Sequence, residues 1–425
     1  MTEKSSLSNI RSITLSNCER WENLRPFGQL PFLKFLRLER MQAVKKLCCP
    51  TSVGGCAFPS LQYLVLRRMP DLELFEGEHM FPLLNELEIE SCPSLKGLPA
   101  LPLTLSRLVI WTAGLTSLPM MQQDCSSGQG RASCSSSSHP ALSGLTIYAC
   151  PNLTSLDGFM LQQQCFPALK ILYIRACENL RHLPEKFFQK LPSLEDLSIE
   201  MCPNLTTHGI LDDRLPNLHS LKIDGCASMT SLPTAEVFPR LSKLSIWNCK
   251  ELSSLDGLQA LLPLQSLAIE GCDKLVELSL LQPPLGLTNT SPTDMVLRDL
   301  RIDRPALLRV EPLRNLNNSV SDLVITDGTE LTSLDEQWLL QNRNSLRRLE
   351  ICKASFAESL PPSMTDLQSL SALEIHDARL LRSIPELPTS MKRLTIRGCR
   401  PELKEYIEGS GKFANIPWVV IEKSS

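Results

Sequence analysis

The segment Leu241-Ser-Lys-Leu-Ser-Ile-Trp-Asn-Cys249 places aliphatic residues at its first, fourth and sixth positions and ends at a cysteine. The same order recurs at Leu169–Cys177, Leu194–Cys202 and Leu218–Cys226. Aliphatic residues two apart project from the same face of a β-strand. One such strand cannot bury that face alone, so the pattern predicts strands that stack into a parallel sheet over a continuous core.

The pattern recurs along the whole chain. Aligned on the second aliphatic residue of each strand, sixteen units are centred on Leu15, Leu38, Leu66, Ile89, Ile110, Ile147, Ile174, Ile199, Ile223, Ile246, Ile269, Ile302, Ile325, Ile351, Ile375 and Ile396. The mean spacing is about 25 residues, within the range of about 20–29 that is typical of leucine-rich repeats. We therefore predict a leucine-rich-repeat solenoid of the α/β class, a curved horseshoe. Its parallel sheet would line the concave side, and its convex side would be irregular or short-helical.

The cysteine position forms a ladder in which other small or apolar residues also occur. Its members are Cys18, Met41, Met69, Cys92, Ala113, Cys150, Cys177, Cys202, Cys226, Cys249, Cys272, Pro305, Gly328, Ala354, Ala378 and Cys399. Free substitution by Ala and Met indicates a buried thiol that acts as a small hydrophobic group. It argues against disulfides and against metal binding by this ladder.

The chain is expected to form one leucine-rich-repeat domain over residues 1–425. A Ser-rich insertion at 122–138 and a Pro- and Thr-rich one at 282–294 are predicted to be loops of that solenoid. Residues 400–425 are predicted to close it. Short convex helices are expected at Pro184–Lys190 and Asp335–Gln341.

Composition excludes several classes of function. The 43 basic and 46 acidic residues give a net charge of −3, which offers no basic footprint for nucleic acid. No run of about 18 apolar residues is present, so we expect no membrane span. The first residues lack the apolar region of a signal peptide, and the expected location is cytoplasmic, with the nucleus also open.

No motif for catalysis, a cofactor or a metal is found. Gly409-Ser-Gly-Lys412 resembles a phosphate-binding loop, but Tyr406 and Phe413 stand where that motif needs Gly and Ser or Thr. No Cys-x-x-Cys pair or His-Glu-x-x-His motif is present, so zinc lacks its usual ligand spacing. The expectation is a protein that is not an enzyme and uses neither cofactor nor metal.

Binding is expected on the side chains that face outward from the sheet. The column after the strand centres reads Ser16, Glu39, Arg67, Glu90, Trp111, Tyr148, Arg175, Glu200, Asp224, Trp247, Glu270, Asp303, Thr326, Cys352, His376 and Arg397. The column before the centres adds Arg37, Glu88, Tyr173, Lys222, Arg301 and Glu350.

Two groups of these residues are candidates for a protein-binding site. Trp111, Tyr148, Tyr173 and Trp247 are of the residue types that dominate protein interfaces. Arg37, Arg40, Arg67 and Arg68 form an N-terminal basic group beside acidic residues. The alternative is a mixed polar face without a single partner site.

Several stretches resemble a known family. Phe27-Gly-Gln-Leu-Pro-Phe-Leu-Lys-Phe-Leu-Arg-Leu38 and Cys399-Arg-Pro-Glu-Leu-Lys-Glu405, with Asn415-Ile-Pro417, are similar to the repeats and closing segment of plant nucleotide-binding leucine-rich-repeat disease resistance proteins of the coiled-coil class. The resemblance implies a module that recognises a pathogen effector or a host protein. It also implies restraint of a nucleotide-binding domain, in cis or in trans, for which the arginine group would be a contact.

The sequence also departs from that family. No coiled coil or nucleotide-binding domain precedes Met1, so this chain alone is not expected to bind ATP. An extracellular receptor would need a signal peptide, and a ubiquitin-ligase adaptor would need an F-box. A free-standing scaffold or adaptor for protein–protein interaction without an immune role remains the alternative.

Overall fold

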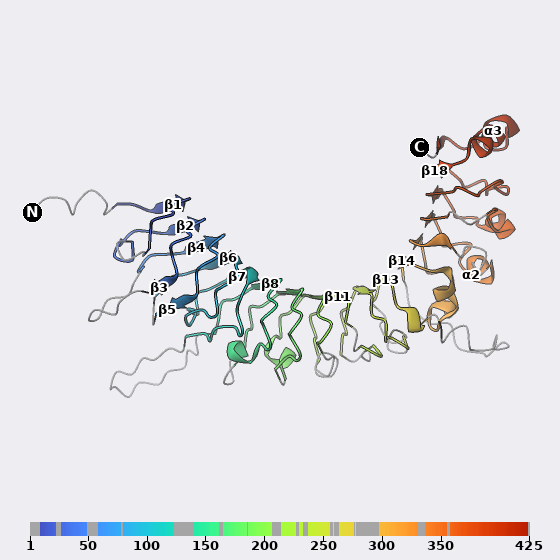
Figure 1. The fold of residues 1–425 in the computed structure, drawn as a ribbon. Helices are drawn as coiled ribbons and strands as arrows, with labels where there is room; N and C mark the ends of the chain where they lie inside the picture. Colours follow the sequence, from blue (N-terminus) through green and yellow to red (C-terminus); the bar gives the residue numbers. More distant parts are fainter. Residues whose placement is uncertain are drawn as a thin grey trace, which may run out of the picture. The chain divides into compact units, whose positions relative to one another are not determined.

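The structure is a computed structural model. It describes residues 9–22, 27–48, 58–77, 80–122, 139–160, 165–184, 186–205, 214–226, 229–232, 237–255, 258, 263–275, 277, 297–329, 336–354 and 358–423. The chain divides into two compact units, which we call unit 1 (Met1–Leu218) and unit 2 (His219–Ser425). Both are built from stacked short strands, and each is described by itself below (Figure 1).

Unit 1 contains a parallel sheet with one strand from each repeat (Figure 1). Its strands are β1 (Ser12–Ser16), β2 (Phe35–Glu39), β4 (Tyr63–Arg67), β6 (Glu86–Cys92), β7 (Arg107–Ala113), β8 (Gly144–Tyr148), β9 (Ile171–Arg175) and β10 (Asp196–Glu200). Two short strands, β3 (Lys46–Cys48) and β5 (Leu74–Glu76), pair separately. Single 3-10 turns occur at η1 (Asp157–Met160) and η2 (Phe188–Lys190).

Unit 2 repeats the arrangement. Its parallel sheet consists of β11 (Ser220–Asp224), β12 (Lys243–Trp247), β13 (Ser266–Glu270), β14 (Asp299–Ile302), β15 (Asp322–Ile325), β16 (Arg348–Ile351), β17 (Ala372–Ile375), β18 (Arg393–Cys399) and β19 (Trp418–Lys423). Helical turns lie between the strands: η4 (Pro305–Arg309), η5 (Leu313–Asn315), α2 (Glu336–Gln341), η7 (Pro362–Asp366) and α3 (Pro401–Ser410).

The strand register confirms the alignment of the repeats. Within unit 1 the predicted strand centres pair with one another, for example Leu15 with Leu38 and Ile89 with Ile110. The same holds in unit 2, where Ile223 pairs with Ile246. Every one of the sixteen predicted centres lies in a strand. The fold is therefore a leucine-rich-repeat solenoid with little helix.

The alternation within each strand explains the core. In β8 the burial pattern alternates, with Leu145 and Ile147 buried and their neighbours partly exposed. Full burial of one such side chain contributes roughly 1.5–3 kcal/mol. Phenylalanines that directly precede a proline, at Phe58, Phe81, Phe166 and Phe238, are also buried and add a second layer to the core. Phe58 stacks on Phe81 with their ring centroids 5.3 Å apart.

The cysteine ladder is buried as predicted. Cys92, Cys150, Cys249 and the other ladder cysteines except the half-buried Cys18 are almost fully covered. Most of these thiols donate to a backbone carbonyl two residues earlier, at 3.6 Å for Cys150 Sγ to Tyr148 O. Burial raises the pKa of Cys92, Cys150 and Cys249 to about 11. These thiols therefore stay protonated and apolar at neutral pH, as packing groups.

The residue before most ladder positions adopts a left-handed conformation, which was not predicted. Arg304, before Pro305, is an exception with an extended backbone and φ −118°. Glycine or asparagine occupies the left-handed position in several repeats, as at Gly225, Gly271 and Asn248. Elsewhere it is held by larger residues, including Arg68 (φ 52°) and Thr112 (φ 54°). Its N–H often donates to the strand end of the next repeat, as from Asn248 to Glu270 O at 2.8 Å. That turn is what directs the chain inward to the ladder residue.

The convex connections agree in part with the predictions. The helix expected at Pro184–Lys190 is replaced, among its described residues, by a turn and the single 3-10 turn η2. The helix expected at Asp335–Gln341 is present as α2 (Glu336–Gln341), with residue 335 outside the described residues. The insertion 122–138, apart from Gln122, and the insertion 282–294 lie outside the described residues. Within 400–425 the structure adds the helix α3 and a strand, β19, that was not predicted.

In the described part of the chain, no helix combines the length and the apolar character that a membrane crossing needs.

Candidate functional site

The outward side chains of each sheet form a solvent-facing surface that we call the open face of that unit. It carries the two predicted columns, because residues on either side of a strand centre point away from the core. Side chains at equal positions on neighbouring strands lie directly beside one another in a parallel register, as Trp111 lies beside Tyr148. The open face is therefore a set of rows that run across the strands.

One row of unit 1 brings predicted aromatic residues together. Trp111 on β7 and Tyr148 on β8 meet edge to face, with ring centroids 6.1 Å apart and an interplanar angle of 61°. The guanidinium of Arg175 on β9 lies 5.6 Å from the centroid of the Tyr148 ring. Trp111 keeps 45% of its surface exposed. We call Trp111, Tyr148, Tyr173 and Arg175 the aromatic cluster.

Arg175 joins the rest of this cluster to a buried acid. Its Nη1 lies 3.4 Å from the hydroxyl of Tyr173 and 3.4 Å from Glu200 Oε2. The hydrogen bond to Tyr173, with the nearby charge of Glu200, raises the pKa of Arg175. Glu200 is only 3% exposed and also accepts a hydrogen bond from Ser198. Arg175 belongs to the predicted outward column, but no role was predicted for it.

The predicted N-terminal basic group lies within a network of mixed charge. Arg37 Nη2 is 2.8 Å from Glu39 Oε2, and Arg67 binds both Glu88 and Glu90, with its Nε 2.9 Å from Glu90 Oε2. Arg68 reaches Glu39 at 4.0 Å. The hydrogen bond from Arg37 and the charges of the nearby arginines lower the pKa of Glu39.

Arg40 and Arg68 occupy the left-handed position after their strands, so they lie at the end of this network and not in the outward columns. Ion pairs between partly exposed groups stabilise a fold by at most about 1 kcal/mol each. The network therefore fixes the orientation of the arginines more than it adds stability. It remains a candidate contact for a partner of mixed or acidic charge.

Trp247, the fourth predicted aromatic residue, belongs to unit 2 and not to the aromatic cluster. It is half-buried at the end of β12, and Lys222 Nζ of β11 lies 4.3 Å from the centroid of its ring. A cation at this distance is attracted to the indole face.

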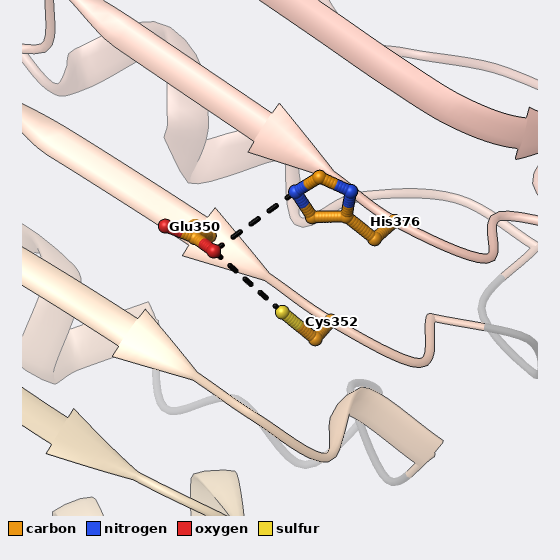
Figure 2. A group of neighbouring side chains, drawn as sticks. All are labelled: Glu350, Cys352 and His376. Atoms are coloured by element: carbon orange, nitrogen blue, oxygen red, sulfur yellow. Dashed lines mark hydrogen bonds and ion pairs between the residues drawn. The ribbon is translucent and has the colours of Figure 1, made fainter. Parts of the chain in front are cut away.

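A group of three side chains that the sequence analysis did not bring together lies on the open face of unit 2. Figure 2 shows Glu350, Cys352 and His376, which come from the ends of the neighbouring strands β16 and β17. Cys352 Sγ lies 3.7 Å from Glu350 Oε1, and His376 Nε2 lies 3.9 Å from the same oxygen. All three residues belong to the two predicted outward columns, so the alignment of neighbouring repeats could have indicated that they lie close together.

The geometry does not suit a nucleophilic cysteine. In a Cys–His pair the thiol donates to the imidazole and a third group orients that ring. Here the thiol of Cys352 donates to Glu350, and burial together with the charge of Glu350 raises the pKa of Cys352. A reactive cysteine needs the opposite shift.

The phosphate-loop resemblance is also explained by the fold. Gly409 and Ser410 end the helix α3, and Gly411 caps it in a left-handed conformation with φ 63°. Phosphate groups bind at the N-terminus of a helix, where backbone N–H groups are free. This segment presents the C-terminal end and is a helix cap.

Comparisons with known proteins point to one kind of protein. The family model described as R13L1/DRL21 LRRs matches residues 1–41. A probable disease resistance protein of Arabidopsis thaliana, RDL5, is 30% identical over 219 residues, which are 47% of this chain and 20% of that protein. RGA1 of Solanum bulbocastanum, described as a disease resistance protein, is 31% identical over 184 residues, 43% of this chain and 17% of that protein. The chain thus matches about a fifth of the length of these relatives.

Solved structures that resemble this chain are repeat proteins of low sequence identity. An LRR protein of Leptospira interrogans, LIC12759, is 17% identical, with a TM-score of 0.40, over 98% of this chain and 90% of that one. The internalin inlF of Listeria monocytogenes is 13% identical, with a TM-score of 0.33, over 89% of this chain and 87% of that one.

Proposed function

Because this chain is a leucine-rich-repeat chain of the plant disease resistance type, we propose that it is a non-catalytic recognition module that binds a protein ligand on its open face. In this proposal the ligand is a pathogen effector or a host protein, the setting is plant innate immunity, and the location is cytoplasmic or nuclear. No nucleic acid or membrane takes part.

The aromatic cluster of unit 1 carries the proposal. Residues that dominate binding energy in protein interfaces are enriched in Trp, Tyr and Arg and lie close together on rigid supports. Trp111, Tyr148 and Arg175 meet these conditions, since they occupy adjacent strands in register and contact one another. Covering the exposed part of Trp111 would remove apolar surface from water, which favours association.

Preorganisation adds to this argument. Ordering a flexible side chain on binding costs roughly 0.5–1.5 kcal/mol of binding free energy. Arg175 is already held by Tyr173 and by the buried Glu200, and its position in turn supports the Tyr148 ring. A ligand would therefore meet a surface whose main anchors are fixed before binding.

The experiment is to capture partners from leaf tissue with the tagged full chain and with two tryptophan variants. Trp111→Ala removes an anchor of the cluster. Trp418→Ala removes a tryptophan of unit 2 that is 62% exposed and serves as the matched control. We expect a protein that is retained by the wild type and by Trp418→Ala but lost with Trp111→Ala. Equal retention by all three would contradict the proposal.

The captured protein also distinguishes an immune role from a general one. An effector, or a host protein retained only after infection, supports the immune role. A partner retained equally from uninfected tissue through the same residues would support a scaffold or adaptor without that role.

The charged network of unit 1 is the proposed contact for a nucleotide-binding domain, in cis or in trans. Arg67 lies at its centre, bound to both Glu88 and Glu90. On co-expression with the nucleotide-binding domain of a related resistance protein, Arg67→Glu is expected to abolish co-purification. Arg382→Glu, at an exposed ion pair of unit 2, serves as the control and is expected to leave it unchanged. Co-purification that is indifferent to Arg67→Glu would overturn this contact.

A further inference from the structure

Glu350, Cys352 and His376 place three different metal-binding groups at one point of the open face of unit 2. The carboxylate, the thiol and the imidazole each offer a ligand atom, and these atoms all lie within 4.8 Å of one another (Figure 2). Glu350 Oε1 is the central atom, 3.7 Å from Cys352 Sγ and 3.9 Å from His376 Nε2. All three side chains are half-buried.

The backbone beneath the cluster is fixed on both sides. Cys352 N donates to Ile325 O and His376 N to Ile351 O, both at 2.8 Å, so the hydrogen-bond ladder of the sheet continues through both residues. Glu350 and Cys352 are two residues apart and therefore share a face. His376 directly follows the neighbouring strand β17. Three ligands from two adjacent strands of a rigid sheet form a preorganised set.

A neighbouring arginine orients the carboxylate. Arg348 Nη2 binds Glu350 Oε2 at 2.9 Å and also reaches Glu374 Oε1 at 3.3 Å. The other oxygen of Glu350, Oε1, faces the thiol and the imidazole. Partners that hold the far atom of a ligand in this way are typical of metal sites, where they set the orientation of the group.

We propose that Glu350, Cys352 and His376 form a binding site for a divalent ion of the zinc class, with a fourth position open to solvent. Sulfur, nitrogen and oxygen ligands together suit Zn²⁺, which accepts all three at about 2.0–2.3 Å. Ligand atoms around a tetrahedral zinc lie about 3.3–3.6 Å apart at such bond lengths. The separations of 3.7 Å from Glu350 Oε1 to Cys352 Sγ and 3.9 Å to His376 Nε2 exceed this by a few tenths of an ångström, a difference that small side-chain rotations close.

Charge also favours the ion. A thiolate at Cys352 and the carboxylate of Glu350, whose other oxygen pairs with Arg348, would together offset the positive charge of the metal. On binding, the thiol of Cys352 exchanges its S–H bond for a bond to the metal, and the proton passes to solvent. No electron is transferred in this step. The site lies in unit 2 and does not depend on the recognition surface proposed for unit 1.

The test is a Co²⁺ titration of the full chain under reducing conditions, followed by Zn²⁺ competition. Co²⁺ reports its ligands by absorption: a thiolate gives a charge-transfer band, and four-coordination gives intense visible bands. We expect saturation at one equivalent, with both signals lost when Zn²⁺ is added. The absence of a thiolate band at one equivalent would overturn the proposal.

Variants assign the signal among the sixteen cysteines of the chain. Cys352→Ser is expected to remove the charge-transfer band, and His376→Gln and Glu350→Gln to weaken binding by about 100-fold or more. Loss of a supporting partner alone costs about 10–100-fold in affinity. Cys165→Ser and His182→Gln, in unit 1, are the matched controls and should bind as the wild type does.

Thermal melting shows whether each variant is folded, and so separates loss of the metal site from misfolding. Zn²⁺ is expected to raise the melting temperature of the wild type and of both controls but not that of Cys352→Ser, since an ion that binds only the folded state stabilises it. A band and a melting shift that survive in Cys352→Ser would place the metal elsewhere and contradict the site.

Discussion

The indole of Trp111 and the phenol ring of Tyr148 meet edge to face, and the two residues are paired in register on β7 and β8. The same row continues to Arg175, which is paired with Tyr148, and then to Glu200. An edge-to-face aromatic pair is worth about 0.5–1.5 kcal/mol beyond its buried area. The row thus couples an exposed aromatic anchor to a buried charge across four strands.

The left-handed position before the ladder residue gives a first prediction. Thr112 has φ 54°, a conformation that costs a β-branched residue roughly 1–2 kcal/mol. Thr112→Gly should therefore raise the free energy of unfolding by up to about 1 kcal/mol, after the greater chain entropy of glycine is subtracted. Urea unfolding measures the change.

The reverse substitution is the control. Gly271 has φ 67°, and a Cβ there would lie 2.6 Å from Asn248 Oδ1 and 3.2 Å from Asn248 Cα. Gly271→Ala should lower the midpoint of unfolding. A Thr112→Gly variant that is less stable than the wild type would show that this turn does not carry the strain.

The register of the repeats predicts the effect of a charge in the core. Ile223 on β11 is 2% exposed and pairs with Ile246. Ile223→Asp would bury an unpaired carboxylate and is expected to destabilise unit 2 by more than about 3 kcal/mol. Ser245→Asp, at an outward position of β12, should change stability by no more than about 0.5 kcal/mol. Unchanged melting of Ile223→Asp would refute the register.

Asn342 makes a prediction about the convex side of unit 2. Its amide nitrogen donates to Leu316 O and Trp338 O at 3.0 and 3.1 Å, and its Oδ1 accepts from Ser319 N and Val320 N. The side chain is fully buried.

Asn342→Leu would leave these buried backbone groups without their partner, at about 1–3 kcal/mol for each group that stays unsatisfied. A loss of about 3 kcal/mol in calorimetric or urea unfolding is therefore expected. The exposed Asn344→Leu is the matched control and should unfold as the wild type does. Equal stability of the two variants would contradict the structural role of Asn342.

The buried thiols predict how stability depends on alkaline pH. Burial raises the pKa of Cys249 to about 11 and that of Cys272 to about 12, above the ordinary thiol value of 9.0. Between pH 9 and 11 the unfolded chain loses these protons while the folded chain keeps them. The free energy of unfolding should therefore fall as pH rises, by up to about 1.4 kcal/mol per pH unit for each thiol.

Other groups also titrate in this range, so a variant isolates the contribution. Cys249→Ala should show a shallower fall of stability between pH 9 and 11 than the wild type, measured as melting temperature at each pH. Identical slopes would mean that the ladder thiol is not buried in its protonated form.

Much of the fold can be predicted from the sequence because each repeat contains the same local pattern of aliphatic and polar residues. The alternation of aliphatic and polar residues fixes which face of a strand is buried, and a shift of one residue would reverse it. Hence the predicted strand centres pair with their neighbours, Leu15 with Leu38 and Ile375 with Ile396. The strand β19 was missed because residues 400–425 were assigned to a closing segment, although Ile421 follows Ile396 by one repeat period and pairs with it.

The site was harder to predict because it depends on contacts between repeats. The columns contained Trp111, Tyr148 and Arg175, yet nothing local indicates that Arg175 links an aromatic ring to a buried Glu200. Glu350 and His376 are similarly far apart in sequence, and only their register brings them together. Motif spacing along one strand cannot reveal a group that is assembled across two.

The affinity of the captured protein for three purified variants tests the central claim most directly. By isothermal titration calorimetry, Trp111→Ala and Tyr148→Ala are each expected to weaken binding by at least about 30-fold, which corresponds to the 2 kcal/mol of an interface hot spot. Trp418→Ala should bind as the wild type does. Unchanged affinity in both cluster variants, with normal folding, would show that the open face of unit 1 does not recognise this ligand through its aromatic cluster.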